Sequence, residues 1–298
     1  MAKTVNYGDM NFALKNGINM PAVGLGTYRL NTQELMFQTI DYALSSGYRL
    51  FDTAPDYGNE KLMREAFKQL LPKYGLTRKE LFITSKLSVH SRGSSFISKA
   101  FERSLENLGL DYIDMYLIHF PGPPNSDSRS MKNESIRAET WMAIAKLYDE
   151  HKVHAIGVSN FTLRHLMQLT EVMAIGPMVN QIEWHPYYYQ LEMLQYCCDH
   201  NIRLQAYCSF GGLSRGHKAL IEDPVVKKIA TIYDTTTAQV LLIWALQRGV
   251  AVIPKSTNYY HLQQNKSLNF SLSEGDVAAL DALSMKNRKY AWNRTGIA

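Results

Sequence analysis

Short apolar runs alternate along this chain with stretches in which apolar residues recur at helical spacing. Each apolar run predicts a buried strand, and each periodic stretch predicts an amphipathic helix. The expected strands cover residues 23–27, 48–53, 81–87, 114–120, 153–160, 178–183, 202–209 and 250–255. Between and after them we expect helices from about residue 31 to 46 and over 60–71, 95–108, 135–150, 162–174, 190–200, 224–233, 237–248, 258–267 and 274–284.

This order of elements predicts the fold class. Most of the expected strands are apolar throughout, as in parallel sheets whose two faces are both covered. Repeated strand–helix units then favour a (β/α)₈ TIM barrel, in the α/β class, and no linker divides residues 1–298 into more than one domain. An open doubly wound sheet is the alternative. That fold usually carries a G-x-G-x-x-G turn, and the Gly24-Leu25-Gly26 stretch lacks the third glycine.

Two segments lie outside the repeating pattern. Residues 12–20 predict an N-terminal β-hairpin with a type I′ turn at Asn16-Gly17, which we expect to cover one end of the barrel. The C-terminal tail, residues 286–298, contains Tyr290, Trp292 and Arg294, and its aromatic side chains suggest that it docks over the active-site face.

Local signals also place helix starts and one long loop. The pair Asn31 and Glu34 and the pair Thr77 and Glu80 each have the spacing of a capping box. Residues 121–133 are rich in proline and serine, which predicts a loop after the fourth strand.

Composition narrows the function classes. The chain has 298 residues, 46% of them apolar and 20% charged, as is usual for a soluble globular protein. A net charge of +5 without a Lys/Arg block favours anionic small molecules over nucleic acid. Neither a signal peptide nor a membrane span is recognisable. We therefore expect a cytoplasmic monomer with no nucleic-acid or membrane partner.

The cysteines indicate reduced thiols. Cys197, Cys198 and Cys208 are an odd number with an adjacent pair, a poor basis for disulfides. No spacing matches a zinc site, and we expect no metal.

Polar residues recur where the strands end. In a parallel barrel these ends meet on one face, which carries the chemistry. Asp52 and Tyr57 follow the second strand, Lys86 the third and His119 the fourth. Each residue has a simpler interpretation: Asp52 as a helix cap, Tyr57 as a loop aromatic, Lys86 as a solvated cation, and His119 as a satisfied core group. Their convergence on one face favours a shared site.

These four residue types together suit the reduction of a carbonyl group. An ammonium on Lys86 would lower the pKa of Tyr57, and Asp52 would pair with Lys86. Tyr57 could then give a proton to an oxygen that gains charge, while a neutral His119 donates a hydrogen bond to the same oxygen. Only a hydride source is missing.

The other strand ends suit a nicotinamide dinucleotide. Three polar side chains could bind a carboxamide, Tyr207 could stack on the ring, and a cation with two hydroxyl groups could bind phosphate. The carboxamide group is Ser159, Asn160 and Gln181, and the phosphate group is Lys255, Ser256 and Thr257.

Six motifs, in order and at matching spacing, resemble the aldo-keto reductases over roughly residues 14 to 283. They are FDTAPDYGNE at 51–60, SK at 85–86, YLIH at 116–119, IGVSNF at 156–161, NQIEWHP at 180–186 and IPKS at 253–256. The resemblance implies a barrel that binds NADPH without a Rossmann fold, a catalytic tetrad of Asp52, Tyr57, Lys86 and His119, and a small-molecule aldehyde or ketone substrate. It implies a cofactor site at Thr27, Tyr28, Asp52, Ser159, Asn160, Gln181, Tyr207, Ser209, Leu213, Lys255, Ser256, Thr257, His261 and Asn265.

The chain departs from the family pattern at the cofactor phosphate. His261 stands where an arginine usually binds the 2′-phosphate, and Gln264 replaces a usual glutamate. Because Lys255 remains, we expect NADPH, with NADH also possible. The preference for NADPH should be modest and should fall as pH rises.

The substrate walls also differ. Ser88 and Phe120 occupy positions where tryptophan is common, and Tyr28 stands at a third wall position. The expected substrate pocket comprises Tyr28, Tyr57, Ser88, His119, Phe120 and Trp292. Smaller walls predict a roomy pocket that accepts bulky carbonyls such as polycyclic ketones.

Two other functions stay open at this point. The first is a non-enzymatic or sensor-type relative, such as a channel-associated subunit or a structural protein, that binds NADPH with little turnover. The second is a barrel aldolase that uses Lys86 or Lys255 as a Schiff-base amine.

Overall fold

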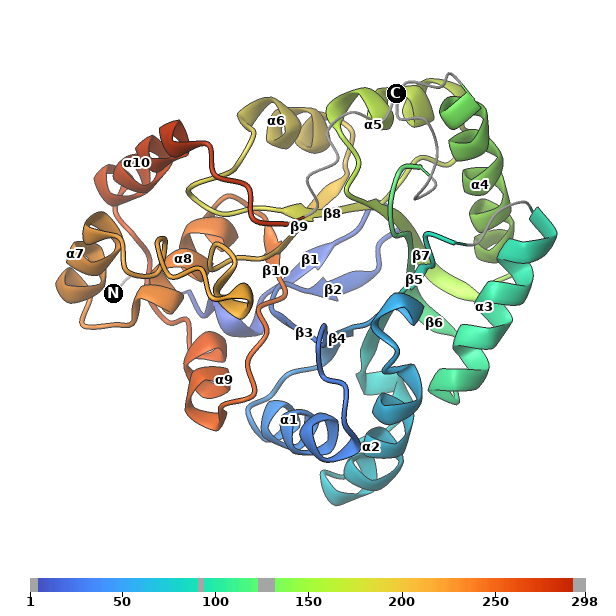
Figure 1. Ribbon diagram of the computed structural model, residues 1–298, viewed down its shortest axis with the longest axis horizontal. Coiled ribbons are helices and arrows are strands. Elements are labelled where there is room, and N and C mark those ends of the chain that lie inside the picture. Colours follow the sequence, from blue (N-terminus) through green and yellow to red (C-terminus); the bar gives the residue numbers. More distant parts are fainter. Residues whose placement is uncertain (1–4, 91–93, 123–131, 292–298) are drawn as a thin grey trace.

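The computed structural model describes residues 5–90, 94–122 and 132–291, and its strands form one parallel barrel (Figure 1). The eight strands are hydrogen-bonded in chain order, each to the next. They are β3 (Gly24–Gly26), β4 (Leu50–Asp52), β5 (Phe82–Leu87), β6 (Ile113–Ile118), β7 (Val153–Ser159), β8 (Val179–Glu183), β9 (Arg203–Tyr207) and β10 (Ala251–Val252). A parallel bridge between Val23 and Val252 joins the last strand to the first. The barrel is confirmed, and the alternative of an open doubly wound sheet is wrong.

Helices surround the strands, as the ring of labelled ribbons in Figure 1 shows. They are α1 (Gln33–Ser45), α2 (Glu60–Lys73), α3 (Ser94–Leu108), α4 (Lys132–Asp149), α5 (Leu163–Val172), α6 (Leu191–Asp199), α7 (Pro224–Ile232), α8 (Thr237–Gln247), α9 (Tyr259–Lys266) and α10 (Glu274–Ala282). Short 3₁₀ turns add η1 (Tyr7–Asp9), η2 (Pro55–Tyr57), η3 (Arg78–Glu80), η4 (Leu213–Arg215) and η5 (Leu283–Lys286).

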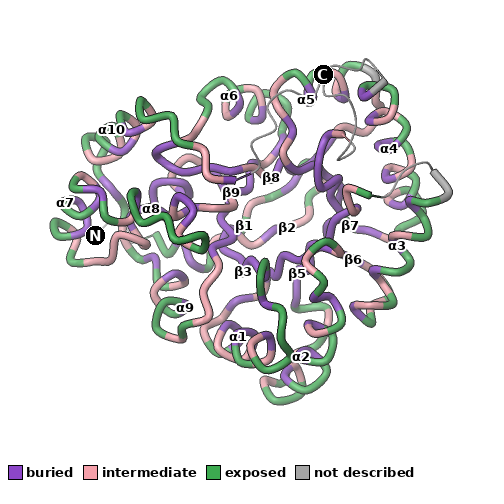
Figure 2. The backbone as a smooth tube through the Cα atoms, viewed as in Figure 1, coloured by how far each residue is buried: buried purple, intermediate pink, exposed green. Residues whose placement is uncertain are grey.

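The apolar strands are buried on both faces, as their lack of alternation predicted. Every residue of β5 and β6 is buried. Figure 2 shows the same arrangement, with buried strands at the centre and the exposed residues on the outer faces of the helices. Six of the eight strands end earlier than expected, whereas β5 and β8 end at the expected residues. β10 ends before Lys255, which lies in the following loop.

The N-terminal hairpin is present, but its turn is not type I′. Strands β1 (Asn11–Ala13) and β2 (Asn19–Pro21) pair antiparallel. Only Gly17 has a positive φ, +84°, and its N–H bonds to the carbonyl of Leu14. This is a type I turn followed by a left-handed residue, the three-residue hairpin loop. The hairpin contacts the barrel where strands begin: Phe12 lies against Arg203 at the start of β9, and Asn16 bonds to the carbonyl of His154 near the start of β7.

The local signals in the helices and loops were partly correct. Thr77 and Glu80 form the expected capping box at η3. The pair Asn31 and Glu34 does not, because Thr32 caps α1 through a bond from the N–H of Leu35. The expected loop 121–133 is shorter, because α4 begins at Lys132, and residues 123–131 lie outside the described residues.

The described part of the C-terminal tail docks on the barrel at the carboxyl end of β8. Both oxygens of Glu183 accept backbone N–H groups of the tail, from Tyr290 at 2.6 Å and Ala291 at 2.8 Å. Arg215 donates to the Tyr290 carbonyl at 2.9 Å. Trp292 and Arg294 lie outside the described residues.

The structure also bears on the cysteines and on membrane-spanning helices. The three cysteines are free, as expected. Within the described ranges, no single helix is long and apolar enough to cross a membrane; α7 and α8 meet that test only as a pair, across an 89° bend.

Candidate active site

A cleft of about 430 Å³ lies among the residues that follow the strands' carboxyl ends. It collects most of the residues that the sequence singled out. From the expected site it is lined by Tyr28, Asp52, Tyr57, His119, Ser159, Asn160, Gln181, Tyr207, Ser209, Leu213, Lys255, Ser256, Thr257 and His261. The sequence did not single out the other lining residues, among them Phe210, Ser214, Arg215, Asn258 and Ala291. Most of these belong to loops, where periodicity carries no signal.

A few expected residues lie elsewhere. The hydroxyl of Thr27 donates to the Asp52 carbonyl at 2.8 Å, beneath the cleft. Asn265 is buried on α9. Ser88 and Phe120 line neighbouring hollows rather than the cleft. Trp292 falls outside the described residues.

Lys86 is the buried cation of the site. Its side chain is wholly buried on β5, and its Nζ lies 2.7 and 2.8 Å from the two carboxylate oxygens of Asp52. The same nitrogen lies 2.9 Å from the Thr53 carbonyl and 3.2 Å from the hydroxyl of Tyr57. A buried ammonium is costly unless paired and hydrogen-bonded, and these contacts meet that need. Lys86 is therefore not a solvated cation, and Asp52 is not a helix cap.

Gln181 holds the other side of Asp52. Its Nε2 donates to Asp52 Oδ2 at 2.7 Å and to Gln205 Oε1 at 2.8 Å. Gln181 lies on β8, several strands away from β4, so the bond crosses the barrel interior. We had assigned Gln181 only to the cofactor. A contact between inward-pointing residues on opposite strands cannot be predicted from their spacing in the sequence.

Tyr57 ends the 3₁₀ turn η2. Pro55 begins that turn and Gly58 closes it with φ +68°. The Tyr57 ring lies 5.1 Å from the ring of Tyr28 and 5.7 Å from that of His119, centre to centre. The structure thus brings Asp52, Tyr57, Lys86 and His119 together, as their positions at neighbouring strand ends predicted.

The expected effect of Lys86 on Tyr57 is wrong. Burial raises the pKa of Tyr57 well above its ordinary value, and the negative charge of Asp52 raises it further. Burial also lowers the pKa of Lys86, which the charge of Asp52 opposes. Because the carboxylate neutralises the ammonium, the pair presents little net charge to the phenol. Tyr57 therefore stays protonated through neutral pH.

His119 has a carboxylate partner that the sequence analysis missed. Its Nδ1 lies 3.0 Å from Asp56 Oδ2. Burial lowers the pKa of His119, and the bond to Asp56 opposes this. Burial alone would raise the pKa of Asp56, but hydrogen bonds from His119 and Ser88 lower it to about 2. The sequence hinted at this contact only by placing an acidic residue immediately before Tyr57, in the same loop.

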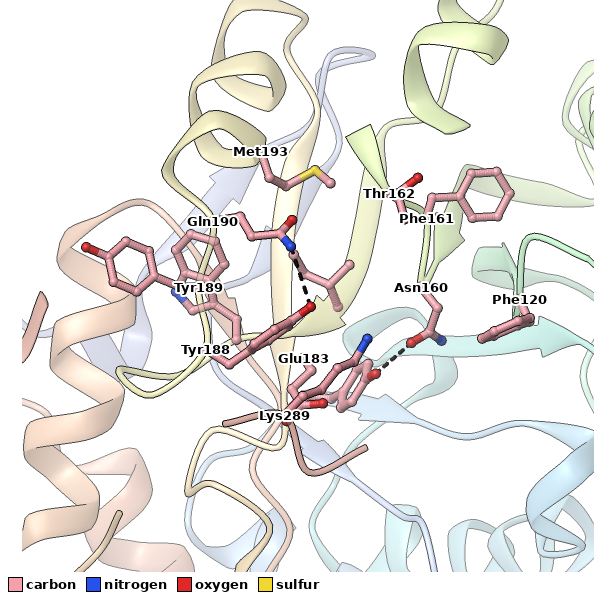
Figure 3. Close-up of a pocket in the computed structure, with 13 residues that line it drawn as sticks. Phe120, Asn160, Phe161, Thr162, Glu183, Tyr188, Tyr189, Gln190, Met193 and Lys289 are labelled. Carbon is pink, nitrogen blue, oxygen red and sulfur yellow. Dashed lines mark hydrogen bonds between the residues drawn. The ribbon is translucent and has the colours of Figure 1, made fainter. Parts of the chain in front are cut away.

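A second polar network joins the ends of β7, β8 and β9. The hydroxyl of Tyr207 donates to Asn160 Oδ1 at 2.6 Å, and Asn160 Nδ2 lies 3.0 Å from both Ser159 Oγ and the His119 carbonyl. Figure 3 shows Asn160 among the side chains that line a small cavity of about 70 Å³. These bonds hold Ser159, Asn160 and Tyr207 in fixed positions along the cleft that all three line.

The far end of the cleft fits an anionic group. Lys255, Ser256 and Thr257 line it. Burial lowers the pKa of Lys255, and the charge of Arg29 lowers it further, so two cations lie near each other. The buried hydroxyl of Ser209 has no hydrogen-bond partner among the described residues. A phosphate oxygen would satisfy both features.

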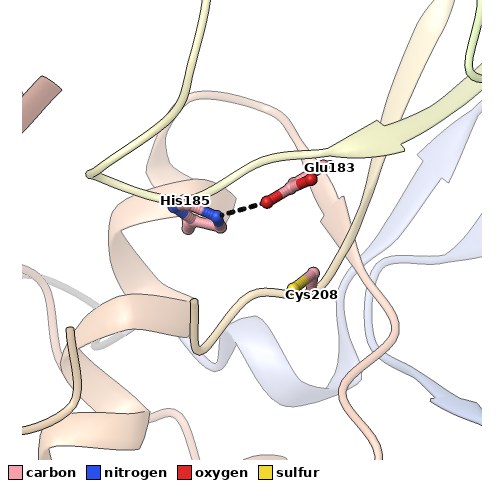
Figure 4. A group of neighbouring side chains, drawn as sticks. All are labelled: Glu183, His185 and Cys208. Carbon is pink, nitrogen blue, oxygen red and sulfur yellow. Dashed lines mark hydrogen bonds and ion pairs between the residues drawn. The ribbon is translucent and has the colours of Figure 1, made fainter. Parts of the chain in front are cut away.

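Glu183, His185 and Cys208 form a cluster (Figure 4), and Cys208 also lines the cleft. Their potential ligand atoms lie within 4.8 Å of one another. The His185 Nε2 lies 3.0 Å from Glu183 Oε1, and the same carboxylate binds the tail backbone. These contacts give the cluster a role in anchoring the tail.

The barrel, with an acid–base cluster and a long cleft at the carboxyl ends of its strands, has the architecture of (β/α)₈ enzymes. Residues 22–285 match the sequence model of the aldo/keto reductase family. The chain is 39% identical to glyoxal reductase of Bacillus subtilis, over 92% of this chain and 93% of that protein. It is 36% identical to an NADPH-dependent D-xylose reductase of Meyerozyma guilliermondii, over 96% and 98% of the two chains.

Solved structures agree. The structure of a Bombyx mori aldo-keto reductase in complex with NADP has a TM-score of 0.85, with 32% identity and 94% of each chain covered. An aldo-keto reductase from a deep-sea metagenome has a TM-score of 0.84, with 37% identity over 94% of this chain and 97% of that one. The protein therefore belongs to the aldo/keto reductase family and is an oxidoreductase.

The raised pKa of Tyr57 predicts that this residue contributes no tyrosinate absorbance near neutral pH. Because Tyr57 ionises only above the ordinary tyrosine value of 10.0, its removal should leave tyrosinate absorbance unchanged below that pH. We expect the alkaline titration curves of the wild type and Tyr57→Phe to superimpose from pH 7 to about 10. A lost transition between pH 7 and 9 in the variant would instead show that Lys86 lowers the pKa of Tyr57.

Proposed function

We propose that this protein reduces an aldehyde or ketone to an alcohol with NADPH, and that Tyr57 is the general acid. The observation that carries the proposal is the Lys86 ammonium, 3.2 Å from the Tyr57 hydroxyl and held by both oxygens of Asp52. A phenol next to a fixed buried cation can release its proton when negative charge develops on a bound oxygen.

The side chains divide the work as follows. The nicotinamide cofactor, when bound, supplies the hydride. Tyr57 donates its proton to the carbonyl oxygen as that oxygen gains charge. Lys86 stabilises the phenolate that results, and Asp52 holds Lys86 in place. His119 lines the same cleft and, in its protonated form, can donate a hydrogen bond that orients the carbonyl oxygen.

For the cofactor we propose NADPH in the long cleft. Ser159, Asn160 and Gln181 would bind the carboxamide, with Tyr207 against the ring. Lys255, Ser256, Thr257 and Ser209 would bind phosphate. The names of two similar proteins, an NADPH-dependent reductase and a reductase in complex with NADP, support this choice. Contacts from Thr27, Leu213 and Asn265 stay predictions, as do the monomeric state and the cytoplasmic location.

The contacts of Lys86 argue against its use as a Schiff-base amine. An amine must be neutral and accessible to attack a carbonyl, and Lys86 is wholly buried and paired with Asp52. The non-enzymatic alternative shares the cleft with the proposed enzyme, so turnover decides between them.

Replacing Tyr57 tests the mechanism directly. In Tyr57→Phe we expect carbonyl reduction to fall by about 10²- to 10⁴-fold, because the proton donor is lost while the ring remains. NADPH absorbance reports turnover. Cofactor fluorescence titration serves as the control and should give an unchanged dissociation constant. Turnover near the wild-type rate in this variant would overturn the proposed mechanism, and no turnover in the wild type would favour the non-enzymatic alternative.

A substrate panel tests the roomy pocket. Similar proteins are named for glyoxal, xylose and a prostaglandin endoperoxide, so family membership leaves the substrate open. Ser88 is turned to Asp56 and Phe120 lines a neighbouring cavity, so neither narrows the cleft. We expect turnover of polycyclic ketones as well as small aldehydes. Activity confined to small aldehydes would contradict the prediction.

The identity of residue 261 should affect the cofactor preference. His261 lines the same cleft as Lys255, Ser256 and Thr257, and an arginine in its place would add a permanent positive charge for a 2′-phosphate. We expect the ratio of NADPH to NADH affinity to rise in His261→Arg. Fluorescence titration with both cofactors measures it. An unchanged ratio in His261→Arg would exclude a contact between residue 261 and the 2′-phosphate.

A further inference from the structure

Asp56 is held firmly against His119. Its Oδ2 lies 3.0 Å from His119 Nδ1 and 3.3 Å from the backbone N–H of Val89, and its Oδ1 accepts a hydrogen bond from the hydroxyl of Ser88. Ser88 and Val89 directly follow β5, so that strand fixes the carboxylate. Asp56 also immediately precedes Tyr57, which places both partners of His119 on one turn.

This contact decides which nitrogen of His119 carries a proton. An ionised carboxylate can only accept hydrogen bonds, so Nδ1 must be the donor and carry hydrogen. Any bond from the ring to a substrate oxygen must then use Nε2. In neutral imidazole with hydrogen on Nδ1, Nε2 is an acceptor. It can accept from an alcohol O–H, but it cannot donate to a carbonyl oxygen.

We propose that Asp56 is a positioning residue that sets the direction of hydrogen bonding by His119. Neutral His119 accepts a bond from the alcohol, and only the imidazolium donates a bond to the carbonyl. His119 transfers no proton in this scheme, because Tyr57 remains the acid. The inference rests on the proposed carbonyl reduction. It adds that the protonation state of His119 decides whether the site favours the carbonyl or the alcohol.

Several charged groups act on the His119 ring. Asp56 favours the imidazolium, and so does Asp52 from β4, whereas Lys86 from β5 and burial oppose it. Tyr57 lies against the ring edge and is protonated. Burial is the largest of these effects, and the pKa of His119 is therefore lowered from its ordinary 6.5. The donor form therefore appears only as pH falls below that value. Carbonyl binding should strengthen toward acid pH, and alcohol binding should strengthen toward neutral pH.

Asp56→Ala tests the proposal because it removes the acceptor that holds hydrogen on His119 Nδ1. Asparagine would keep that acceptor, because the atom facing Nδ1 also accepts the N–H of Val89, so an amide would place its oxygen there. Without the acceptor, neutral His119 can carry its hydrogen on Nε2 and donate to a carbonyl oxygen. At pH 8 we expect the KM for carbonyl to fall about two- to tenfold and the KM for alcohol to rise by a similar factor. The carbonyl KM should also lose its pH dependence between pH 5 and 8.

Asp199→Ala is the matched control. Asp199 ends α6 on the outside of the barrel, where it accepts only from Gln195 among the described residues. Its pH profiles should match the wild type. A wild-type pH profile in Asp56→Ala, or a uniform loss of kcat at every pH, would overturn the proposal. If Tyr57→Phe also keeps full turnover, the proposed function has failed; if Tyr57→Phe is inactive, only the role of Asp56 has failed.

A second measurement needs neither turnover nor a folded variant of Asp56. In wild-type protein labelled with ¹⁵N-histidine, the His119 signals, identified by their absence in His119→Gln, report the tautomer. At pH 8 we expect hydrogen on Nδ1 and a lone pair on Nε2. Hydrogen on Nε2 in the wild type would overturn the inference.

Discussion

The site depends on the buried ion pair of Lys86 and Asp52. An ammonium with no solvent exposure is stable only where a carboxylate and further acceptors surround it. The barrel supplies these acceptors from adjacent strands, because β4 and β5 are hydrogen-bonded in register, with Asp52 opposite Thr84. Gln181 then fixes the carboxylate from across the barrel. Removing either charge would leave the other unpaired in the interior, so the fold and the pair depend on each other.

Neutralisation of the pair explains the state of Tyr57. A free ammonium beside a phenol would favour the phenolate, but burial raises the pKa of Tyr57, and the charge of Asp52 raises it further. Tyr57 thus holds its proton until a bound oxygen gains negative charge. The contribution of Lys86 is then specific to the transition state, which is the condition for raising a rate rather than merely tightening binding.

The strand-end residues could be predicted because a parallel barrel has a simple rule: residues that follow buried strands meet on one face. From the sequence alone, that rule places Asp52, Lys86 and His119 together. It could not supply the bond from Gln181 to Asp52, which spans the barrel interior. Nor could it supply the sign of the pKa shift at Tyr57, since that sign depends on how completely Asp52 cancels Lys86. The hairpin shows the same limit, because Asn16-Gly17 predicts a tight turn while the exact loop depends on where the strands pair.

The loop between β4 and α2 carries the two groups that control protons, Tyr57 and Asp56, and its own bonds keep it rigid. Thr53 Oγ1 donates to Asn59 Oδ1 at 2.7 Å, and Asn59 Nδ2 donates to the Thr27 carbonyl at 2.8 Å. Asn59 thereby ties this loop to the one that follows β3, instead of capping α2. A loop fixed at both ends holds the phenol against Lys86 and the carboxylate against His119 at the same time. Because one turn sets both contacts, a shift of that turn would change the acid and the orientation of the substrate oxygen together.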